Sequence, residues 1–351
     1  MLTRRKFLQN SLTATVAGFV VPGLSFGFAE EYLSFDLHSH PGVFFGKGLK
    51  DYPGDAGVMK TTTEMNSGHL SGAFFSLVAD VAIIERTPTG IRPTRAYATG
   101  EAWKEYHRQL TALKDLLKTL PATLATTVAE LDNATKNKKV AAFIACEGGD
   151  FLDGKAELLD EMYRDGVRSI QLVHYAPNAL GDLQTEATQH NGLSKVGKEV
   201  VVRMNKLGMV VDVAHASFKT VQDVAGFTNA PIILSHSILK MEDTRPLSRR
   251  AITSEHAKLV AGTGGVIGAW PSGFNNSFEE FVDNTLRLVD VAGIDHVGLG
   301  TDMDGNFKPV FGSYLQLSQW AEALKAKGLS KEEVGKILGG NARRVLAKVI
   351  K

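Results

Sequence analysis

The chain has 351 residues, of which 44% are hydrophobic and 22% are charged, a composition typical of globular proteins. Its formal net charge of +1 gives no electrostatic reason to expect nucleic acid as a partner. The single cysteine, Cys146, excludes an internal disulfide and a zinc site built from cysteines. Any bound metal must therefore be held by His, Asp and Glu side chains.

The first 29 residues have the pattern of an export signal. A basic segment at 3–8 (TRRKFL) precedes an uncharged apolar stretch at 11–28, and residues 27–29 (GFA) form a small-x-small cleavage site. The paired arginines resemble a twin-arginine signal, which exports proteins already folded. A membrane anchor is the alternative, but Pro22 and glycines interrupt an apolar stretch that is shorter than the roughly 20 residues of a membrane span.

The remaining residues, 30–351, are expected to form a single domain in the periplasm or outside the cell, with no stable membrane span after cleavage. Short apolar or β-branched runs recur along this part of the chain, and polar-apolar helical stretches separate most of them. Continuous apolar strands are typical of a parallel sheet covered on both faces. About eight repeats of strand and helix favour a (β/α)8 TIM-type barrel over a doubly wound sheet. The predicted strands are 32–37, 72–78, 140–146, 169–173, 209–214, 231–235, 265–270 and 296–302.

Helices are predicted from apolar spacing and from residues that cap helix ends. Residues 101–120 and 155–166 read as helices, and Gly166 is a plausible C-terminal cap of the second. Residues 194–208 carry a possible N-cap at Ser194 and a closing glycine at the other end. Between 83 and 99 prolines and a glycine break any period, which indicates an excursion. It either lines the mouth of a site or is a plain surface loop.

Polar residues follow six of the eight predicted strands at the point where each strand ends. In a (β/α)8 barrel these ends meet at one mouth, where catalytic groups lie. A single histidine at such a position is more often structural than a ligand. However, five of the ten histidines occupy these positions, whereas His69, His107, His190, His256 and His296 do not and receive no role. The strand-end residues are His38, His40, Glu147, His174, His215, His236 and Asp302.

These residue types form the ligand set of zinc and similar divalent ions. Alternation along a strand directs both histidines of His38-Ser39-His40 to the same face. The two carboxylate oxygens of Glu147 can bridge two ions, and His215 and His236 can hold the second ion. Two such ions share a bridging water, lower its pKa to yield hydroxide near neutrality, and polarise a carbonyl. Asp302 is then placed to take the proton of that water and pass it to a leaving amine.

The same segments resemble the renal (membrane) dipeptidase family of the amidohydrolase superfamily. The resemblance covers nearly the whole of 30–351, and it implies a dipeptidase with two divalent ions, expected to be Zn²⁺, on a distorted (β/α)8 barrel of the metal-dependent hydrolase type. Dimers occur in the family, which makes a homodimer an open possibility, although the sequence shows no interface signal. The motifs that carry the resemblance, in order, are ACEGG, LVHYAPNALGD, VDVAHAS, PIILSHS, GIDHVGLGTDMDG and LGGNARRVL.

The resemblance implies a role for each matching residue. It makes Glu147 the bridging ligand, His215 and His236 the ligands of the second metal, and Asp302 the acid/base residue. His174 opens an H-x-x-x-N-x-x-x-D motif and contacts the scissile group. Asn178, as a further substrate contact, and Asp182 complete that motif.

Two features depart from the family pattern. An arginine after the SHS motif holds the substrate carboxylate in the family, and Arg250 is the candidate because a guanidinium binds a carboxylate in a bidentate manner. The spacing from His236 is longer here, so Arg245 and Arg249 remain possible, as does a surface salt bridge for any of the three.

The second departure is His40, which stands where the family has aspartate. His40 could replace that ligand, or turn away and leave one metal, or mark a broken site in a protein that only binds. An imidazole in place of the carboxylate adds one positive charge to the site, which favours anionic ligands.

The leading functional hypothesis is hydrolysis of small dipeptides, including those with a C-terminal D-residue, by a hydroxide that bridges the two metals. Within the same chemistry the rivals are hydrolases of N-acyl amino acids, lactones or β-lactams. A non-catalytic exported binding protein is the rival from a different class. Glu147, His174 and Asp302 argue against it, because ligand binding alone needs no proton shuttle.

Overall fold

The fold is known from a computed structural model, which describes residues 32–87, 90–241, 244–245 and 247–351. The expected export signal at 1–29 lies outside these described residues. Within them, no helix is both long and apolar enough to cross a membrane.

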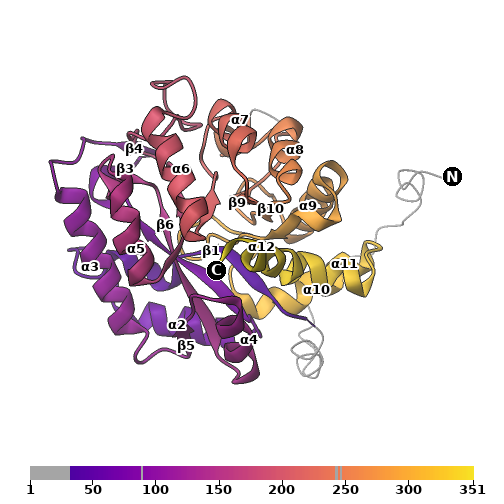
Figure 1. Cartoon of the computed structure of the whole chain (residues 1–351). Helices are drawn as coiled ribbons and strands as arrows, with labels where there is room; N and C mark the ends of the chain where they lie inside the picture. The colour runs from indigo at the N-terminus through magenta and orange to yellow at the C-terminus, as the bar shows by residue number, and fades with distance from the viewer. Residues whose placement is uncertain (1–31, 88–89, 242–243, 246) are drawn as a thin grey trace.

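Eight parallel strands form a closed barrel, and helices surround it (Figure 1). The strands pair around the ring in the order β2, β1, β11, β10, β9, β8, β7 and β6, and the pairing of β2 with β6 closes it. This confirms the predicted (β/α)8 barrel. The strands are β1 (Phe35–Ser39), β2 (Gly72–Val78), β6 (Val140–Glu147), β7 (Val167–Gln171), β8 (Val210–Asp212), β9 (Ile233–Ser237), β10 (Val266–Ala269) and β11 (Val297–Leu299).

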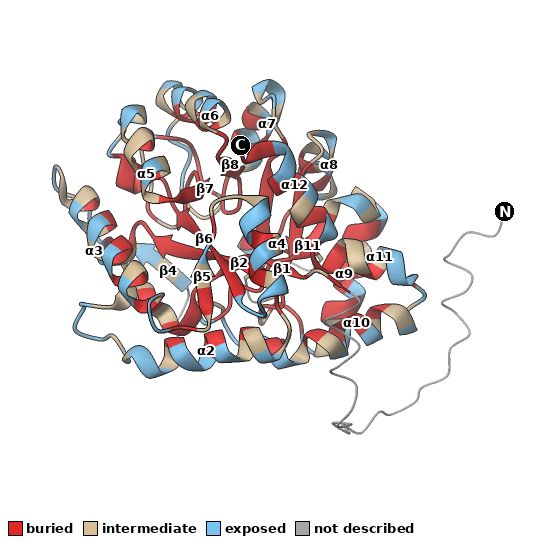
Figure 2. Ribbon diagram, turned by 60° about the horizontal axis from the view of Figure 1, so that its bottom comes forward, coloured by how far each residue is buried: buried red, intermediate tan, exposed pale blue. Residues whose placement is uncertain are grey.

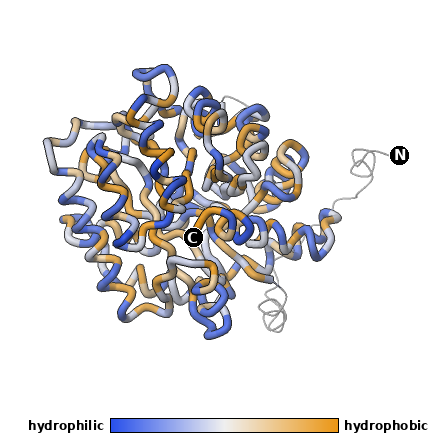
Figure 3. The backbone as a smooth tube through the Cα atoms, viewed as in Figure 1, coloured by the Kyte–Doolittle hydropathy of each residue, from blue (hydrophilic) through white to orange (hydrophobic). Residues whose placement is uncertain are grey.

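The helices carry their apolar residues on the side that faces the barrel and their polar residues outward (Figures 2 and 3). They are α2 (Asp55–Ser67), α3 (Glu101–Leu116), α4 (Val128–Lys136), α5 (Leu159–Asp165), α6 (Lys195–Leu207), α7 (Phe218–Phe227), α8 (Ser254–Gly262), α9 (Phe278–Ala292), α10 (Leu317–Ala326), α11 (Lys331–Gly335) and α12 (Asn341–Val349).

The predicted helix ends agree with the structure at two helices. The Ser194 side chain accepts a hydrogen bond from the Gly197 N–H at the start of α6, and Gly208 closes that helix in a left-handed conformation. Gly166 ends α5 in the same way, with φ 103°. The helix predicted at 101–120 ends earlier, at Leu116.

Two short elements depart from the predicted plan. β5 (Ala122–Leu124) is an additional parallel strand that pairs with the first half of β6. The excursion at 83–99 contains an antiparallel hairpin formed by β3 (Ile84–Thr87) and β4 (Gly90–Pro93). Three-residue strands and hairpins broken by prolines carry too little periodicity to be recognised in the sequence.

The interior of the barrel is filled by apolar side chains at its N-terminal end. Phe35, Phe74 and Phe143 make edge-to-face contacts there, with ring centroids 5.4–6.1 Å apart. Val345 and Leu346 of α12 belong to the same buried cluster. Figure 1 shows this helix over the centre of the ring. Because this end is closed, access to the interior is left to the opposite end, where the strands finish.

An irregularity in β1 sets the direction of its two histidines. Phe35 and Leu37 both belong to the interior cluster, so strict alternation would direct Ser39 inward next. The register of β1 against β2 shifts between Asp36 and Ser39. A bulge of this kind re-aims the following side chains, and His38 and His40 now face the interior.

Candidate metal centre

Seven of the sequence-predicted site residues converge on the C-terminal mouth of the barrel. Each is buried, with at most 9% of its surface exposed. The shared location confirms that the strand ends meet, as a parallel barrel requires. His38 and His236 lie within β1 and β9, Glu147 ends β6, and His40, His174, His215 and Asp302 follow β1, β7, β8 and β11.

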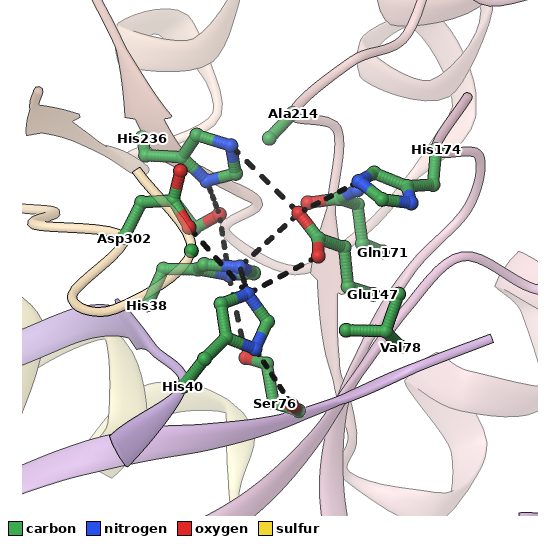
Figure 4. A network of polar contacts seen from close by, with 12 residues as sticks. His38, His40, Ser76, Val78, Glu147, Gln171, His174, Ala214, His236 and Asp302 are labelled. Carbon is green, nitrogen blue, oxygen red and sulfur yellow. Dashed lines mark hydrogen bonds and ion pairs between the residues drawn. The ribbon is translucent and has the colours of Figure 1, made fainter. Parts of the chain in front are cut away.

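The Glu147 carboxylate is the centre of this group (Figure 4). Its Oε1 atom lies 3.2 Å from His38 Nε2 and 3.3 Å from His174 Nε2. The same oxygen is 3.5 Å from His215 Nε2 and 3.9 Å from His236 Nε2. Burial opposes ionisation, but the imidazoles, those of His174 and His38 foremost, hold the pKa of Glu147 well below its usual range.

His40 approaches the other oxygen of this carboxylate, with Nε2 3.2 Å from Glu147 Oε2 and 3.0 Å from His38 Nε2. Its Nδ1 atom lies 2.9 Å from the backbone carbonyl of Ser76. Because a carbonyl only accepts, Nδ1 carries a proton, and in the neutral imidazole the Nε2 lone pair then points into the cluster. His40 therefore faces the site and has not turned away from it.

His215 and His236 form a second pair, with Nε2 atoms 3.1 Å apart. His215 has a left-handed backbone, φ 64°, a strained conformation that proteins tend to retain at functional sites. Burial lowers the pKa of both imidazoles well below their ordinary value, and the charge of Arg250 acts in the same direction. Both rings are therefore neutral, which is the form that binds metals.

The donor set fits divalent cations. Nε2 of His40 and a Glu147 oxygen face each other across 3.2 Å. When His40 is neutral both atoms are acceptors, and either a proton or a divalent cation between them relieves their repulsion. Groups with potential ligand atoms within 4.8 Å are His38 with His40 and Asp302, His38 with Glu147 and His236, and Glu147 with His174 and His215.

His174 has a partner that sequence reasoning missed. Its Nδ1 atom lies 2.6 Å from Asp80 Oδ1, and the other oxygen of Asp80 accepts from the backbone N–H groups of Tyr175 and Ala176. Burial opposes protonation of His174, but the carboxylates of Asp80 and Glu147 outweigh it and raise the pKa to about 9. Asp80 follows β2 by two residues, so the strand-end rule could have found it.

Asp302 lies at the rim of the cluster in a left-handed conformation, with φ 51°. Its Oδ1 atom is 3.5 Å from His40 Nε2. Burial raises the pKa of Asp302 to about 6, with His40 opposing the shift and Glu147 adding to it. A β-carbon at Gly305 would lie 2.5 Å from Asp302 Oδ1 and 2.6 Å from His40 Cδ2, so only glycine leaves these two side chains in place.

The structure distinguishes the three candidate arginines. Arg250 is 3% exposed and places Nη2 3.3 Å from His236 Nε2. Its guanidinium lies 5.7 Å from the Trp270 ring centroid and also donates to the Gln184 amide oxygen. Arg245 instead pairs with Glu280.

Arg249 is exposed and donates to the backbone carbonyl of Thr185. Among the described residues no carboxylate lies within 4.0 Å of Arg250. Its Nε atom is buried and has no hydrogen-bond partner. Within the part of the chain that the structure describes, Arg250 is therefore a buried cation beside the cluster with no carboxylate within 4.0 Å.

The other two residues of the H-x-x-x-N-x-x-x-D motif do not reach the cavity. The Asn178 amide donates to the Leu172 carbonyl in its own loop and to Asp150 in the loop after β6. The Asp182 carboxylate accepts backbone N–H groups at 189, 190 and 192. Neither residue is among those that line the cavity, and a substrate contact by Asn178 stays a prediction.

A cavity of about 500 Å³ opens above the cluster. Its floor includes His40, Glu147, His174, His215, His236 and Asp302. The wall is predominantly apolar, as small-molecule sites usually are. The hairpin borders it, so the excursion at 83–99 lines the site mouth. The apolar and aromatic wall residues are Phe45, Val78, Val81, Ile84, Ile91, Tyr175, Leu247, Trp270 and Phe307.

Two curated dipeptidases are similar in sequence to this chain. Dipeptidase tcpJ of Claviceps purpurea is 32% identical over 223 residues, which make up 61% of this chain and 52% of that protein. Dipeptidase verJ of Clonostachys rogersoniana is 30% identical over 236 residues, which make up 64% of this chain and 60% of that protein. The chain thus spans between half and two thirds of the length of these curated relatives.

Solved structures share the fold. A metallopeptidase from Rhodobacter sphaeroides, bound to a phosphinate mimic of the dipeptide L-Ala-D-Ala, superposes with a TM-score of 0.77 at 21% identity, covering 91% of this chain and 99% of its own. The probable dipeptidase PvdM from Pseudomonas aeruginosa gives 0.75 at 21% identity, covering 92% and 96%. The sequence model described as membrane dipeptidase, peptidase family M19, matches residues 29–351. The chain therefore belongs to the membrane dipeptidase family, peptidase family M19.

Proposed function

We propose that this protein is a metal-dependent dipeptidase that hydrolyses the single peptide bond of its substrate. The observation that carries the proposal is the Glu147 carboxylate, whose two oxygens face the Nε2 atoms of five imidazoles at the floor of a closed-ended cavity. A second support is Arg250, a buried guanidinium without a carboxylate partner among the described residues.

We propose two divalent ions, most consistent with Zn²⁺ because the donors are imidazoles and carboxylates. His38, His40 and Glu147 would hold the first ion, and Glu147, His215 and His236 the second. Such a pair of ions supplies a hydroxide at neutral pH and polarises the scissile carbonyl. Replacement of the family aspartate by His40 keeps a ligand at that position, because its lone pair points into the cluster.

The remaining steps fall to side chains of this chain. Arg250 would hold the substrate's terminal carboxylate by charge-assisted hydrogen bonds. His174, kept protonated and oriented by Asp80, would donate from Nε2 to the oxygen that becomes negative as the carbonyl is attacked. Asp302 would take the proton of the attacking water and give it to the leaving amine.

We further propose that substrates with a C-terminal D-residue are accepted. The support is that the related metallopeptidase from Rhodobacter sphaeroides binds a mimic of L-Ala-D-Ala. N-acyl amino acids, lactones and β-lactams present the same kind of polarisable carbonyl and are the alternative substrates. We also propose export through residues 1–29, since the family match begins only at residue 29.

Metal analysis combined with a substrate panel tests the proposal. We expect the purified protein to contain about two equivalents of zinc and to hydrolyse L-Ala-D-Ala with kcat in the usual enzymatic range of about 1–10³ per second. Chelation is expected to abolish turnover, and added zinc to restore it. Stoichiometric metal without turnover of any dipeptide, N-acyl amino acid, lactone or β-lactam would instead identify a binding protein.

Substitution of Arg250 by methionine is expected to weaken substrate binding. Loss of a charge-assisted hydrogen bond to the carboxylate raises KM for L-Ala-D-Ala by roughly 10- to 100-fold. Arg250→Lys keeps the charge but loses the bidentate geometry, so an intermediate KM is expected. Arg249→Met is the matched control, because that guanidinium lies on the surface and donates to Thr185. A KM for Arg250→Met equal to that of wild type, in a folded protein, would reject this role.

A further inference from the structure

The β3–β4 hairpin borders the cavity with residues of both of its faces. In its register Arg86 lies opposite Ile91, and Glu85 lies opposite Arg92. Because side chains alternate along a strand, Ile84, Arg86 and Ile91 share one face, and Glu85 and Arg92 share the other. Arg86 Nη2 donates to the Gly305 carbonyl, 3.3 Å away, across the cavity mouth next to Asp302. Residues of both faces border the cavity, and Arg86 is the one that reaches across its mouth to Gly305.

Arg86 brings a positive charge to the mouth of the cavity. Among the described residues no Asp or Glu lies within 4.0 Å of its guanidinium, and its contact with Gly305 is to a neutral carbonyl. A guanidinium has five donors in a planar fork, so several remain for a ligand. The guanidinium would therefore contact the part of a substrate that lies at the hairpin end of the cavity.

The carboxylates nearby are already engaged. Glu147 faces imidazoles, and Asp302 lies 3.5 Å from His40. Glu85 also borders the cavity, but its carboxylate lies 2.6 Å from Arg92 Nη2. Asp304 accepts from the Gly42 N–H and the Thr61 hydroxyl. Among the described residues that border the hairpin end of the cavity, Arg86 is a cation with no carboxylate within 4.0 Å, and its charge favours an anionic group.

The hairpin and Arg250 lie on opposite sides of the metal centre. The hairpin follows β2, and Arg250 follows β9. These strands are four steps apart in either direction around the closed ring. If Arg250 holds the C-terminal carboxylate, as the proposed function requires, the N-terminal residue of the substrate extends toward the hairpin.

We propose that Arg86 determines specificity by binding a side-chain carboxylate of the substrate's N-terminal residue, so that dipeptides beginning with Glu or Asp are preferred. Ile84 and Ile91, which flank Arg86 on the same face, would contact the methylene groups of that side chain. The inference rests on the proposed dipeptidase function and on the orientation that Arg250 imposes. It names a substrate class that neither the metal centre nor Arg250 specifies.

The test compares two isosteric substrates, L-Glu-Ala and L-Gln-Ala. Their C-terminal alanine is the L or the D enantiomer, whichever gives faster hydrolysis by the zinc-loaded wild type. We expect kcat/KM to be about 5- to 10-fold higher for the Glu substrate, which is the effect of one charge-assisted hydrogen bond at an exposed site. Arg86→Gln is expected to bring this ratio to about 1, and Arg86→Glu to invert it. The ratio for wild type is also expected to fall in high salt.

Arg92→Gln is the matched control, because it removes a cation from the other face of the same hairpin. It is expected to leave the Glu/Gln ratio as in wild type. A wild-type ratio near 1, a ratio that survives Arg86→Gln, or an equal loss in Arg92→Gln would each overturn the inference. In those outcomes turnover of L-Gln-Ala would still support the dipeptidase proposal, whereas no turnover of either dipeptide would overturn both.

Discussion

Glu147→Ala is expected to lose both metal ions together. The carboxylate is the group that faces both histidine pairs, with Oε1 3.2 Å from His38 and Oε2 3.2 Å from His40 on one side, and Oε1 3.5 Å from His215 on the other. Removal of a residue that only hydrogen-bonds to a metal ligand lowers metal affinity by about 10- to 100-fold. Removal of a ligand that bridges both ions is therefore expected to lower the affinity for each ion by more than about 100-fold. Metal content measured after gel filtration in metal-free buffer is expected to fall from about two equivalents to nearly none.

A matched variant separates this effect from a general effect of removing a carboxylate. Glu322→Ala removes an exposed carboxylate on α10 that pairs with Lys325, and we expect it to keep both ions. Glu147→Gln retains the shape but not the charge, and is expected to lose metal almost as completely. Retention of two ions by folded Glu147→Ala would exclude the bridging role, and retention of one ion would assign Glu147 to a single metal.

The strand ends could be predicted from the sequence because one rule of parallel barrels governs them. Each apolar run ends where its strand ends, and the carboxyl ends of all strands meet at one mouth. His38, Glu147, His215, His236 and Asp302 therefore converge without any knowledge of loops. The same rule reaches Asp80, which lies two residues beyond the end of β2 and was not among the predicted site residues.

The positions of loop side chains could not be obtained in this way. Motif spacing places Asn178 four residues after His174, yet its amide turns toward Leu172 within an irregular segment that has no period. Three arginines follow β9 at similar distances in the sequence, and only tertiary packing buries Arg250 against Trp270. Periodicity specifies the faces of helices and strands, whereas loop paths depend on contacts between distant residues.

The direction of His40 shows the same limit within a strand. Alternation correctly places it on the same face as His38, but alternation from Phe35 and Leu37 alone would direct both histidines outward. The register shift in β1 and the Ser76 carbonyl together aim the His40 lone pair at Glu147. Bulges depend on the pairing of two strands, so no single segment reveals them.

Asp302→Asn is expected to keep metal and substrate but to lose turnover. Asparagine has the shape of aspartate and can still lie beside His40, yet it cannot accept a proton from water. Loss of a general acid/base group lowers kcat by roughly 10²- to 10⁴-fold. The metal content and the Kd of a phosphinate mimic of L-Ala-D-Ala are expected to remain close to those of wild type. The measurements are steady-state kinetics, metal analysis and calorimetric titration of the inhibitor.

Asp304→Asn is the neighbouring control, because that carboxylate accepts from Gly42 and Thr61 rather than facing the cluster. Its substitution is expected to lower the thermal stability of the loop without a comparable loss of kcat, since Asp304 touches none of the reacting atoms. A wild-type kcat for Asp302→Asn would remove Asp302 from the mechanism. Loss of one metal in that variant would instead show that Asp302 acts as a ligand beside His38 and His40, a grouping that the distances also permit.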